Sequence, residues 1–214
     1  MPKALVEVGD RPLLWHVVSS YERQGFSEFL FLTGHLGNQI EAYIETGELP
    51  ASGSYRALNT GEDTLTGERV LRAKGEVGDG TFCLTYVDGL SDIDFETELE
   101  FHRDHGKVAT VALVRPRLQW GVARLEGIEV TGFTEKPVSD EWSNGGFFCL
   151  EQSVFGWLEE AESLEGGPLE RLAGAGELMG YLHQGYWDCV DTYKDLLEVN
   201  ELWKKGDPPW LAAS

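Results

Sequence analysis

The apolar run Val108-Ala-Thr-Val-Ala-Leu-Val114 constrains the fold more than any other stretch, because it is uncharged and rich in β-branched residues. Such a run suits a strand that is buried on both faces, as strands of parallel sheets are. Apolar periodicity and turn residues predict further strands at 28–34, 82–88, 145–150 and 179–183, and helices at 12–25, 36–44, 91–106, 153–161 and 192–205. This alternation predicts an α/β fold with a Rossmann-like, doubly wound and mostly parallel sheet.

Shorter signals refine this prediction. Residues 121–134 favour a small antiparallel insertion, with two strands joined in a hairpin at Glu126-Gly127. Ser91 is expected to cap the helix that follows it, and Thr192 together with Asp195 to cap the last helix. The region 47–67 is rich in turn residues and is expected to form turns.

Length and charge bound the domain organisation and the partners. The 214 residues suffice for one sizeable core, so we predict a single domain spanning 1–214. The chain carries 17 Lys plus Arg against 37 Asp plus Glu, a formal charge of −20. A surface this acidic repels nucleic acid and anionic membranes, which argues against both as general partners. An anionic substrate would have to be held by a few local lysines and by metal ions.

Cysteine content and hydropathy indicate the compartment. Cys83, Cys149 and Cys189 are odd in number and far apart, which argues against a disulfide framework and a zinc ribbon and favours a reducing environment. No apolar run reaches the length of a membrane span, and the N-terminus lacks the layout of a secretion signal. We therefore expect a cytoplasmic protein.

Asp88 is the first candidate for chemistry, because the apolar stretch that begins at Phe82 stops abruptly at Asp88-Gly. In an open α/β sheet, ligands bind beyond the carboxyl ends of the strands, so an acid there can present a metal-binding carboxylate to a substrate. The alternative is a buried strand followed by an ordinary turn, since Asp-Gly is a common turn signal.

Four further positions gain interest only in combination. Lys3 precedes a short apolar run, and Lys136 precedes a proline that favours an extended backbone there. Asn144-Gly145 opens a pair of glycines that would let the backbone approach a ligand closely. Asp191 stands just before the cap of the last helix. Taken singly, each position has an ordinary structural explanation. Lys3 would be a solvated lysine and Lys136 a surface lysine, whereas Asn144-Gly145 would form a turn and Asp191 would cap a helix.

Taken in the order of the chain, these sequence motifs resemble one protein family. The motifs are Pro-Lys-x-Leu-Val-Glu-Val-Gly, Leu-Leu-Trp-His, Tyr-x-Asp-Gly-x-x-Asp, Phe-His-x-x-His-Gly-Lys-x-Ala-Thr, Glu-Lys-Pro, Asn-Gly-Gly-Phe-Phe and Gly-Tyr-Trp-x-x-x-Asp-Thr. Together they are similar to the sugar-1-phosphate nucleotidyltransferases, and among these to the glucose-1-phosphate cytidylyltransferases. The resemblance covers nearly the whole chain, and the family often assembles into multimers, so a homo-oligomer is an expectation.

The resemblance implies a role for each matching position. Asp88 and Asp191 would hold a catalytic Mg²⁺, Lys3 would contact the nucleotide phosphates, and Lys136 would contact the sugar phosphate. The sugar pocket would be lined by Asn144, Gly145 and Glu165, with Trp187 beside it, and the nucleotide side by Thr66, Gly67 and Arg69.

The implied reaction fits these residue types. An oxygen of glucose 1-phosphate would attack the α-phosphorus of CTP, and pyrophosphate would leave. The attacking oxygen is already anionic, so no general base is required. The site must instead bring several negatively charged phosphate groups into line. A carboxylate-held Mg²⁺ and two lysines can do this by positioning the phosphates and neutralising their charge.

The sequence departs from the family pattern at its start. The opening strand and the Gly-Gly-x-Gly-Thr-Arg loop of the family are absent before Pro2-Lys3. The missing strand would be central, so the edges of its two neighbours would have to pair with each other, with another chain or with water. One expectation is that Met1 is not the true start; the other is a shortened protein.

Two further departures concern the nucleotide. Val87 and Glu68 stand where the family has glycines. Nucleotide choice is therefore less determined than reaction class. The alternatives to the cytidylyl transfer are a catalytically silent relative that binds nucleotide sugar or a partner chain, and an enzyme that uses another nucleotide or sugar phosphate.

Overall fold

A four-stranded sheet forms the centre of the fold in the computed structural model, which describes residues 1–211. Its strands are, in order, β11 (Leu178–Leu182), β7 (Ala109–Val114), β10 (Ser143–Leu150) and β5 (Phe82–Thr85). β11 runs parallel to β7, whereas β10 runs antiparallel to both β7 and β5. Three of the four strands therefore share one direction, and the predicted mostly parallel α/β sheet is confirmed, with β10 as the exception.

A second, two-stranded sheet pairs β3 (Glu28–Thr33) with β4 (Ser54–Asn59) in parallel. α1 (Leu13–Glu22) precedes this sheet and α2 (Gly37–Glu45) connects its strands, both close to the predicted bounds. The prediction of turns throughout 47–67 is wrong at β4. That strand alternates only partly between apolar and polar residues, and its pairing with β3, a long-range contact, gives it its conformation.

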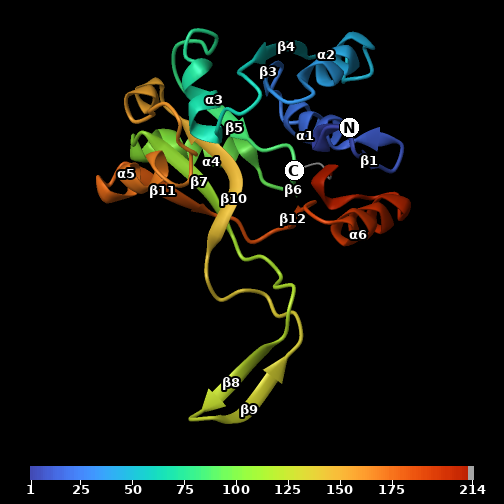
Figure 1. The fold of residues 1–214 in the computed structure, drawn as a ribbon, viewed down its shortest axis with the longest axis vertical. Coiled ribbons are helices and arrows are strands. Elements are labelled where there is room, and N and C mark those ends of the chain that lie inside the picture. The colour runs from blue at the N-terminus through green and yellow to red at the C-terminus, as the bar shows by residue number, and fades with distance from the viewer. Residues whose placement is uncertain (212–214) are drawn as a thin grey trace.

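The two sheets are separate in Figure 1, and we call the cavity between β3 and β5 the slot. β3 pairs only with β4, and β5 pairs only with β10, so within residues 1–211 each strand leaves one edge without a partner strand. A cavity of about 870 Å³ lies between them and is lined by all residues of both strands. α1 contributes Leu14 and Val17 to its walls, and α3 (Thr66–Arg72) contributes Val70. The expected pair of open edges is thus present, and the two edges do not pair with each other.

α4 (Phe95–His105) confirms the predicted helix and its end at Gly106, which takes the left-handed conformation with φ 63°. The predicted cap is wrong by three residues. Asp94 caps the helix, because its carboxylate accepts a hydrogen bond from the backbone N–H of Thr97 at 2.9 Å. Ser91 lies in a strand instead, and its hydroxyl donates to the carbonyl of Tyr186.

The region after β10 differs from the predicted helix at 153–161. Only a short 3₁₀ helix, η2 (Gln152–Gly156), forms there, and the α-helix comes later as α5 (Pro168–Gly174). Gly156 interrupts the first segment, and Pro168 supplies a fixed φ at the first turn of the second. Local periodicity did not distinguish these two apolar segments.

The C-terminal part returns to the middle of the molecule. β12 (Trp187–Cys189) pairs antiparallel with β6 (Gly89–Ser91), directly after Asp88. α6 (Tyr193–Lys204) begins at the predicted capping box: Thr192 and Asp195 each accept a hydrogen bond from the backbone N–H of the other. η3 (Pro209–Leu211) then buries Trp210 against His16 of α1.

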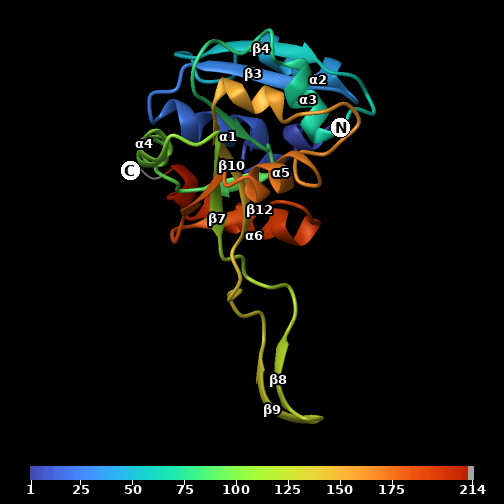
Figure 2. The same ribbon diagram turned by 90° about the vertical axis from the view of Figure 1, so that its left-hand side faces the viewer.

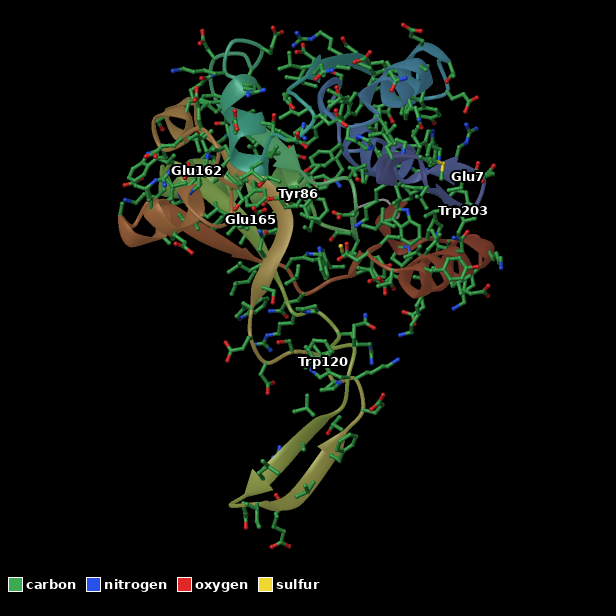
Figure 3. The ribbon with its side chains drawn as sticks, viewed as in Figure 1. Glu7, Tyr86, Trp120, Glu162, Glu165 and Trp203 are labelled. Atoms are coloured by element: carbon green, nitrogen blue, oxygen red, sulfur yellow. The ribbon has the colours of Figure 1, made fainter. Side chains whose placement is uncertain are left out.

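At the N-terminus, η1 (Lys3–Leu5) is followed by two-residue strands β1 (Glu7–Val8) and β2 (Arg11–Pro12), which pair with each other. Gly9 joins them with φ 67°, and the indole of Trp203 on α6 packs where a side chain at this position would be. This contact anchors the N-terminal segment, and with it Lys3, to α6 (Figure 3).

The predicted hairpin is confirmed as β8 (Val122–Glu126) and β9 (Glu129–Thr134), joined at Gly127 with φ 61°. It extends far from the remaining elements in two perpendicular views (Figures 1 and 2). Among the described helices, none is both long and apolar enough to cross a bilayer.

Candidate functional site

The pairing of β6 with β12 brings the two predicted metal ligands together. Gly89 lies opposite Cys189, and the backbone N–H of Val190 donates to the carbonyl of Asp88 at 2.9 Å. Asp88 immediately precedes one strand and Asp191 shortly follows the other, so the antiparallel ladder places both at the same end. Two segments that are distant in sequence thus present carboxylates to one place.

Lys3 lies between these carboxylates. Its Nζ donates to Asp88 Oδ2 at 2.8 Å and to Asp191 Oδ1 at 2.5 Å. η1 carries this lysine, and the contact of Gly9 with Trp203 fixes the segment that follows. Three of the four residues predicted to act in the transfer step therefore form one hydrogen-bonded cluster.

The cluster changes the protonation of its members. Burial acts to lower the pKa of Lys3, but the hydrogen bonds to Asp191 and Asp88 outweigh it and the pKa is raised. The hydrogen bond from Lys3 lowers the pKa of Asp191. Burial and the nearby carboxylates raise the pKa of Cys189 to about 12, so its thiol stays protonated at neutral pH.

The donor set fits a hard divalent cation. One ligand atom each from Asp88, Cys189 and Asp191 lies within 4.8 Å of the others. Carboxylate oxygens are the protein ligands that Mg²⁺ prefers, and it completes its octahedron with water and phosphate oxygens. A protonated thiol is a poor ligand for such an ion. Asp88 and Asp191 could therefore hold Mg²⁺ once the Lys3 ammonium moves from between them.

A second polar cluster surrounds Glu165. Its carboxylate accepts a hydrogen bond from the hydroxyl of Tyr86 and another from Thr66 Oγ1 at 3.0 Å. Figure 3 shows Tyr86 and Glu165 side by side. Burial and the acceptor Glu165 raise the pKa of Tyr86 well above its usual range. The sequence predicted Thr66 and Glu165 for different substrates, and the structure brings them into contact.

Gly67 and Arg69 follow Thr66 on α3 and serve the fold directly. A side chain at Gly67 would meet the carbonyl of Glu162 at 2.9 Å, so this glycine permits close packing of α3 on the 162–164 segment. The Arg69 guanidinium donates to Thr33 O at 2.9 Å and to Thr60 Oγ1 at 2.6 Å. Arg69 thereby ties α3 to the ends of β3 and β4.

The predicted sugar-pocket residues Asn144 and Gly145 lie on β10, which is joined to β12 through Trp187. Asn144 accepts a hydrogen bond from the backbone N–H of Gly146 at 2.8 Å, at an irregularity in the β10–β7 register. Gly145 fits tightly, because a side chain there would lie 2.9 Å from the carbonyl of Ala112. Its own carbonyl accepts from Trp187 Nε1 at 2.8 Å, so Trp187 links β12 to β10.

Lys136 lies apart from this cluster. Among residues 1–211, no hydrogen bond or ion pair joins it to Asp88 or Asp191. It is half-buried at the base of the hairpin, where the neighbouring ammonium of Lys194 lowers its pKa. Its φ of 47° also corrects the prediction of an extended backbone. The bend is held by Arg117 Nη1, which donates to the Lys136 carbonyl at 3.3 Å, and this contact overrides the influence of the following proline.

The slot between β3 and β5 opens onto part of the site. Of the predicted site residues, Thr66, Arg69, Asp88 and Glu165 line its cavity. Sequence reasoning missed Tyr86 and Asp195. Tyr86 stands two residues before Asp88 in a motif that was already singled out, and Asp195 was identified only as part of the helix cap.

The chain is similar in sequence to known proteins. The nucleotidyl transferase family model matches residues 1–206. The chain is 38% identical over 231 positions to the probable glucose-1-phosphate cytidylyltransferase of Bacillus subtilis (strain 168), which covers 98% of this chain and 91% of that protein. It is 34% identical over 232 positions to the glucose-1-phosphate cytidylyltransferase of Salmonella typhi, covering 98% and 90%.

Solved structures share the fold. The crystal structure of HddC from Yersinia pseudotuberculosis superimposes with a TM-score of 0.76 over 95% of this chain and 90% of that chain, at 17% identity. At this identity the match supports the arrangement of helices and strands alone.

Proposed function

The chain belongs to the nucleotidyl transferase family and is a sugar-1-phosphate nucleotidyltransferase, and from that premise we propose that it transfers a cytidylyl group from CTP to glucose 1-phosphate. The products would be CDP-glucose and pyrophosphate. The choice of CTP and glucose 1-phosphate rests on the names of two relatives that are 38% and 34% identical over nearly the whole chain.

The observation that carries the proposal is the convergence of two acids and one lysine. Asp88 precedes β6 and Asp191 follows β12, and both accept hydrogen bonds from Lys3 Nζ. A site that keeps two carboxylates and an ammonium group within contact distance suits a polyanionic substrate that arrives with a divalent cation. On binding, the ammonium would exchange its carboxylate partners for phosphate oxygens.

The transfer step is a substitution at phosphorus. An oxygen of the glucose 1-phosphate phosphoryl group forms a bond to the α-phosphorus of CTP, while the bond from that phosphorus to the bridging oxygen of the β-phosphate breaks. The electron pair leaves with pyrophosphate. No proton has to be removed from the attacking oxygen at neutral pH, so positioning and charge neutralisation are the tasks of the protein.

The residues divide these tasks. Asp88 and Asp191 would hold the metal, and Lys3 would contact the phosphates that develop charge. A bound Mg²⁺ would supply Lewis-acid neutralisation of the triphosphate oxygens. Asn144 and Gly145 would orient the sugar, and Trp187 would hold the Gly145 backbone through its hydrogen bond.

Pyrophosphate release tests the proposal. Purified protein should release pyrophosphate from CTP only when glucose 1-phosphate and Mg²⁺ are both present. Parallel reactions with UTP, dTTP, ATP and GTP, and with mannose 1-phosphate, decide nucleotide and sugar choice. Release with another pair would keep the reaction class and replace the substrates, whereas no release with any pair would refute catalysis.

A second candidate is binding of a nucleotide sugar without turnover. It is favoured by the hydrogen bonds that engage Arg69 with Thr33 and Thr60, and by the absence of a hydrogen bond or ion pair from Lys136 to Asp88 or Asp191 within residues 1–211. Titration calorimetry with CDP-glucose distinguishes the two. Binding without pyrophosphate release under any condition would favour this candidate over catalysis.

A further inference from the structure

Two of the three cysteines, which are far apart in sequence, face each other in the central sheet. β5 and β10 are neighbouring antiparallel strands (Figure 1), and their register sets Cys83 opposite Cys149. Both thiols are free in the structure. The sequence spacing argued against a disulfide framework, but the fold brings this pair to one place.

The hydrogen-bond pattern of the ladder puts the pair at a position where side chains are closest. The backbone N–H of Tyr86 donates to the carbonyl of Gly146, which continues the same register. Hydrogen-bonded and non-hydrogen-bonded pairs alternate along an antiparallel ladder, and Cys83 lies three residues before Tyr86. Cys83 and Cys149 therefore form a non-hydrogen-bonded pair. In such pairs the Cα atoms are about 4.5 Å apart, within the roughly 4.4–6.8 Å that a disulfide spans.

The two thiols differ in their access to reagents. Cys83 is half-buried and lines the slot, so a small solute that enters the slot can reach it. Cys149 is fully buried, at 0% exposure, and β7 pairs with the other edge of its strand. The hydrogen bond with Cys83 and burial raise the pKa of the Cys149 thiol, which stays protonated at neutral pH. An oxidant therefore meets Cys83 first.

The ordinary explanation of a buried cysteine is packing as a small apolar side chain. It accounts for each residue alone, and Cys83 does pack against the core that contains Tyr21 and Phe147. It does not require that two cysteines stand directly opposite each other with one of them lining a cavity. The third cysteine, Cys189, lies on β12 opposite Gly89 and serves as an internal reference.

We propose that Cys83 and Cys149 are a site of reversible thiol oxidation, which closes as a disulfide between β5 and β10 when a peroxide enters the slot. Cys83 is the residue that reacts with the peroxide, and Cys149 is the residue that resolves the product. A thiol reductant reopens the bond by exchange.

The oxidation takes two steps. The Cys83 thiolate attacks one oxygen of hydrogen peroxide and the O–O bond breaks, so that Cys83 becomes a sulfenic acid and the leaving hydroxide takes up a proton to form water. The Cys149 sulfur then attacks the Cys83 sulfur, the S–O bond breaks, and hydroxide leaves with the Cys149 proton as a second water. The two thiols together lose two electrons and two protons, and the peroxide is reduced to water.

The bond would fasten the strand that leads to Asp88. Within residues 1–211, β5 pairs only with β10, and its other edge borders the slot. A covalent link between the two strands holds this edge strand in place and restricts the unfolded chain, because it closes a long loop between residues 83 and 149. Oxidation should therefore stabilise the sheet beside the candidate site.

Thiol counting on the full-length protein tests the site. The reduced chain carries three thiols. After treatment with hydrogen peroxide and unfolding in urea, one thiol should remain, and digestion should yield a cross-linked peptide that contains Cys83 and Cys149. The midpoint of urea unfolding should be higher for the oxidised protein than for the reduced protein. Dithiothreitol should restore the three thiols and the original midpoint.

Three variants identify the pair. Cys83→Ser and Cys149→Ser should form no cross-link and should show no rise of the urea midpoint after peroxide. Cys189→Ser keeps the pair, so its two thiols should both be lost into the cross-link. Circular dichroism checks that each variant is folded. Cys83 is only half-buried, so its variant keeps the test decisive if the change at buried Cys149 prevents folding.

Four results would overturn the proposal. They are three remaining thiols at a peroxide concentration that oxidises free cysteine, oxidation of Cys83 to a sulfinic acid without a bond to Cys149, a cross-link that joins Cys189 or a second chain, and an unchanged or lower urea midpoint in the cross-linked protein. None of these measurements depends on nucleotide transfer, so their failure is separate from failure of the proposed activity.

Discussion

The carboxylate of Asp195 accepts a hydrogen bond from the backbone N–H of Asp191 at 3.2 Å, in addition to its bond from Thr192 N–H at 2.7 Å. Asp195 is buried, at 5% exposure, although it belongs to a helix cap. The cap of α6 and the backbone of the candidate metal ligand are therefore held by one side chain.

Asp195→Ala should affect stability and the site together. Loss of the capping box should lower the free energy of unfolding by about 1 kcal/mol, and the freed Asp191 backbone should reduce turnover as well. Urea unfolding and pyrophosphate release measure the two effects. Glu198→Ala on the same helix is the control: its carboxylate forms only an exposed pair with Lys194, so both quantities should change little. Equal effects of both variants would contradict this role of Asp195.

Asp88→Asn and Asp191→Asn should each reduce turnover at least about a hundredfold, a loss of about 2.7 kcal/mol of transition-state stabilisation. Each variant removes one of the two anionic groups that would hold the metal. The control is Asp188→Asn, because this carboxylate accepts a hydrogen bond from the backbone N–H of Cys189 and, within residues 1–211, none from Lys3. Near-normal turnover in either test variant would refute the assignment.

Lys3→Met should change metal binding and turnover in opposite directions. In the free protein the Lys3 ammonium neutralises both carboxylates, so its removal should strengthen the binding of Mg²⁺ measured by calorimetry. Turnover should fall, because the phosphate contact is lost. Arg11→Met is a control that removes a positive charge lying over the Trp15 ring and 3.9 Å from Glu48; within residues 1–211 it forms no ion pair with Asp88 or Asp191. Unchanged Mg²⁺ affinity in Lys3→Met would contradict the bridging arrangement.

Glu98 should make stability depend on pH. The residue is 2% exposed, one of its carboxylate oxygens has no hydrogen-bond partner among the described residues, and burial raises its pKa to about 8. Because the folded state holds this proton more tightly than the unfolded state, stability is full below the unfolded pKa near 4.5 and falls as pH rises towards 8. The slope is about 1.4 kcal/mol per pH unit.

Glu98→Gln should remove that slope, which urea unfolding at several pH values between 5 and 8 can measure. Glu96→Gln on the exposed side of the same helix should retain it. The prediction fails if the two variants show the same pH dependence.

Elements with a local cause could be predicted from the sequence. The turn at Gly127 fixes the hairpin, and Thr192 with Asp195 fixes the start of α6, because each signal acts within four residues. β4 was missed because its conformation depends on its pairing with β3, far away in the chain, whereas α5 was displaced because Pro168 starts the helix later than apolar periodicity alone predicted. The capping of α4 by Asp94 was missed because two acceptable caps stand three residues apart.

The candidate site divides in the same way. The motifs identified Asp88, Asp191 and Lys3, and the structure brings them together. The contact of Tyr86 with Glu165 joins residues 79 positions apart, and no local pattern encodes such a distance. Lys136 was expected near the carboxylates, but its position follows the bend at the base of the β8–β9 hairpin, where Arg117 donates to its carbonyl.

The slot between β3 and β5 has a mechanical consequence. Within residues 1–211 no backbone hydrogen bonds between strands join the β3–β4 sheet to the four-stranded sheet. The two sheets are therefore held together mainly by the side chains of the helices that pack on them. Small shifts of one sheet relative to the other break no hydrogen bond between strands and therefore cost little free energy. Thr33, which accepts a hydrogen bond from Arg69, belongs to the β3–β4 sheet. Asp88 comes shortly after β5 of the four-stranded sheet. A relative shift of the two sheets would therefore change the distance between Thr33 and Asp88, which line the same cavity.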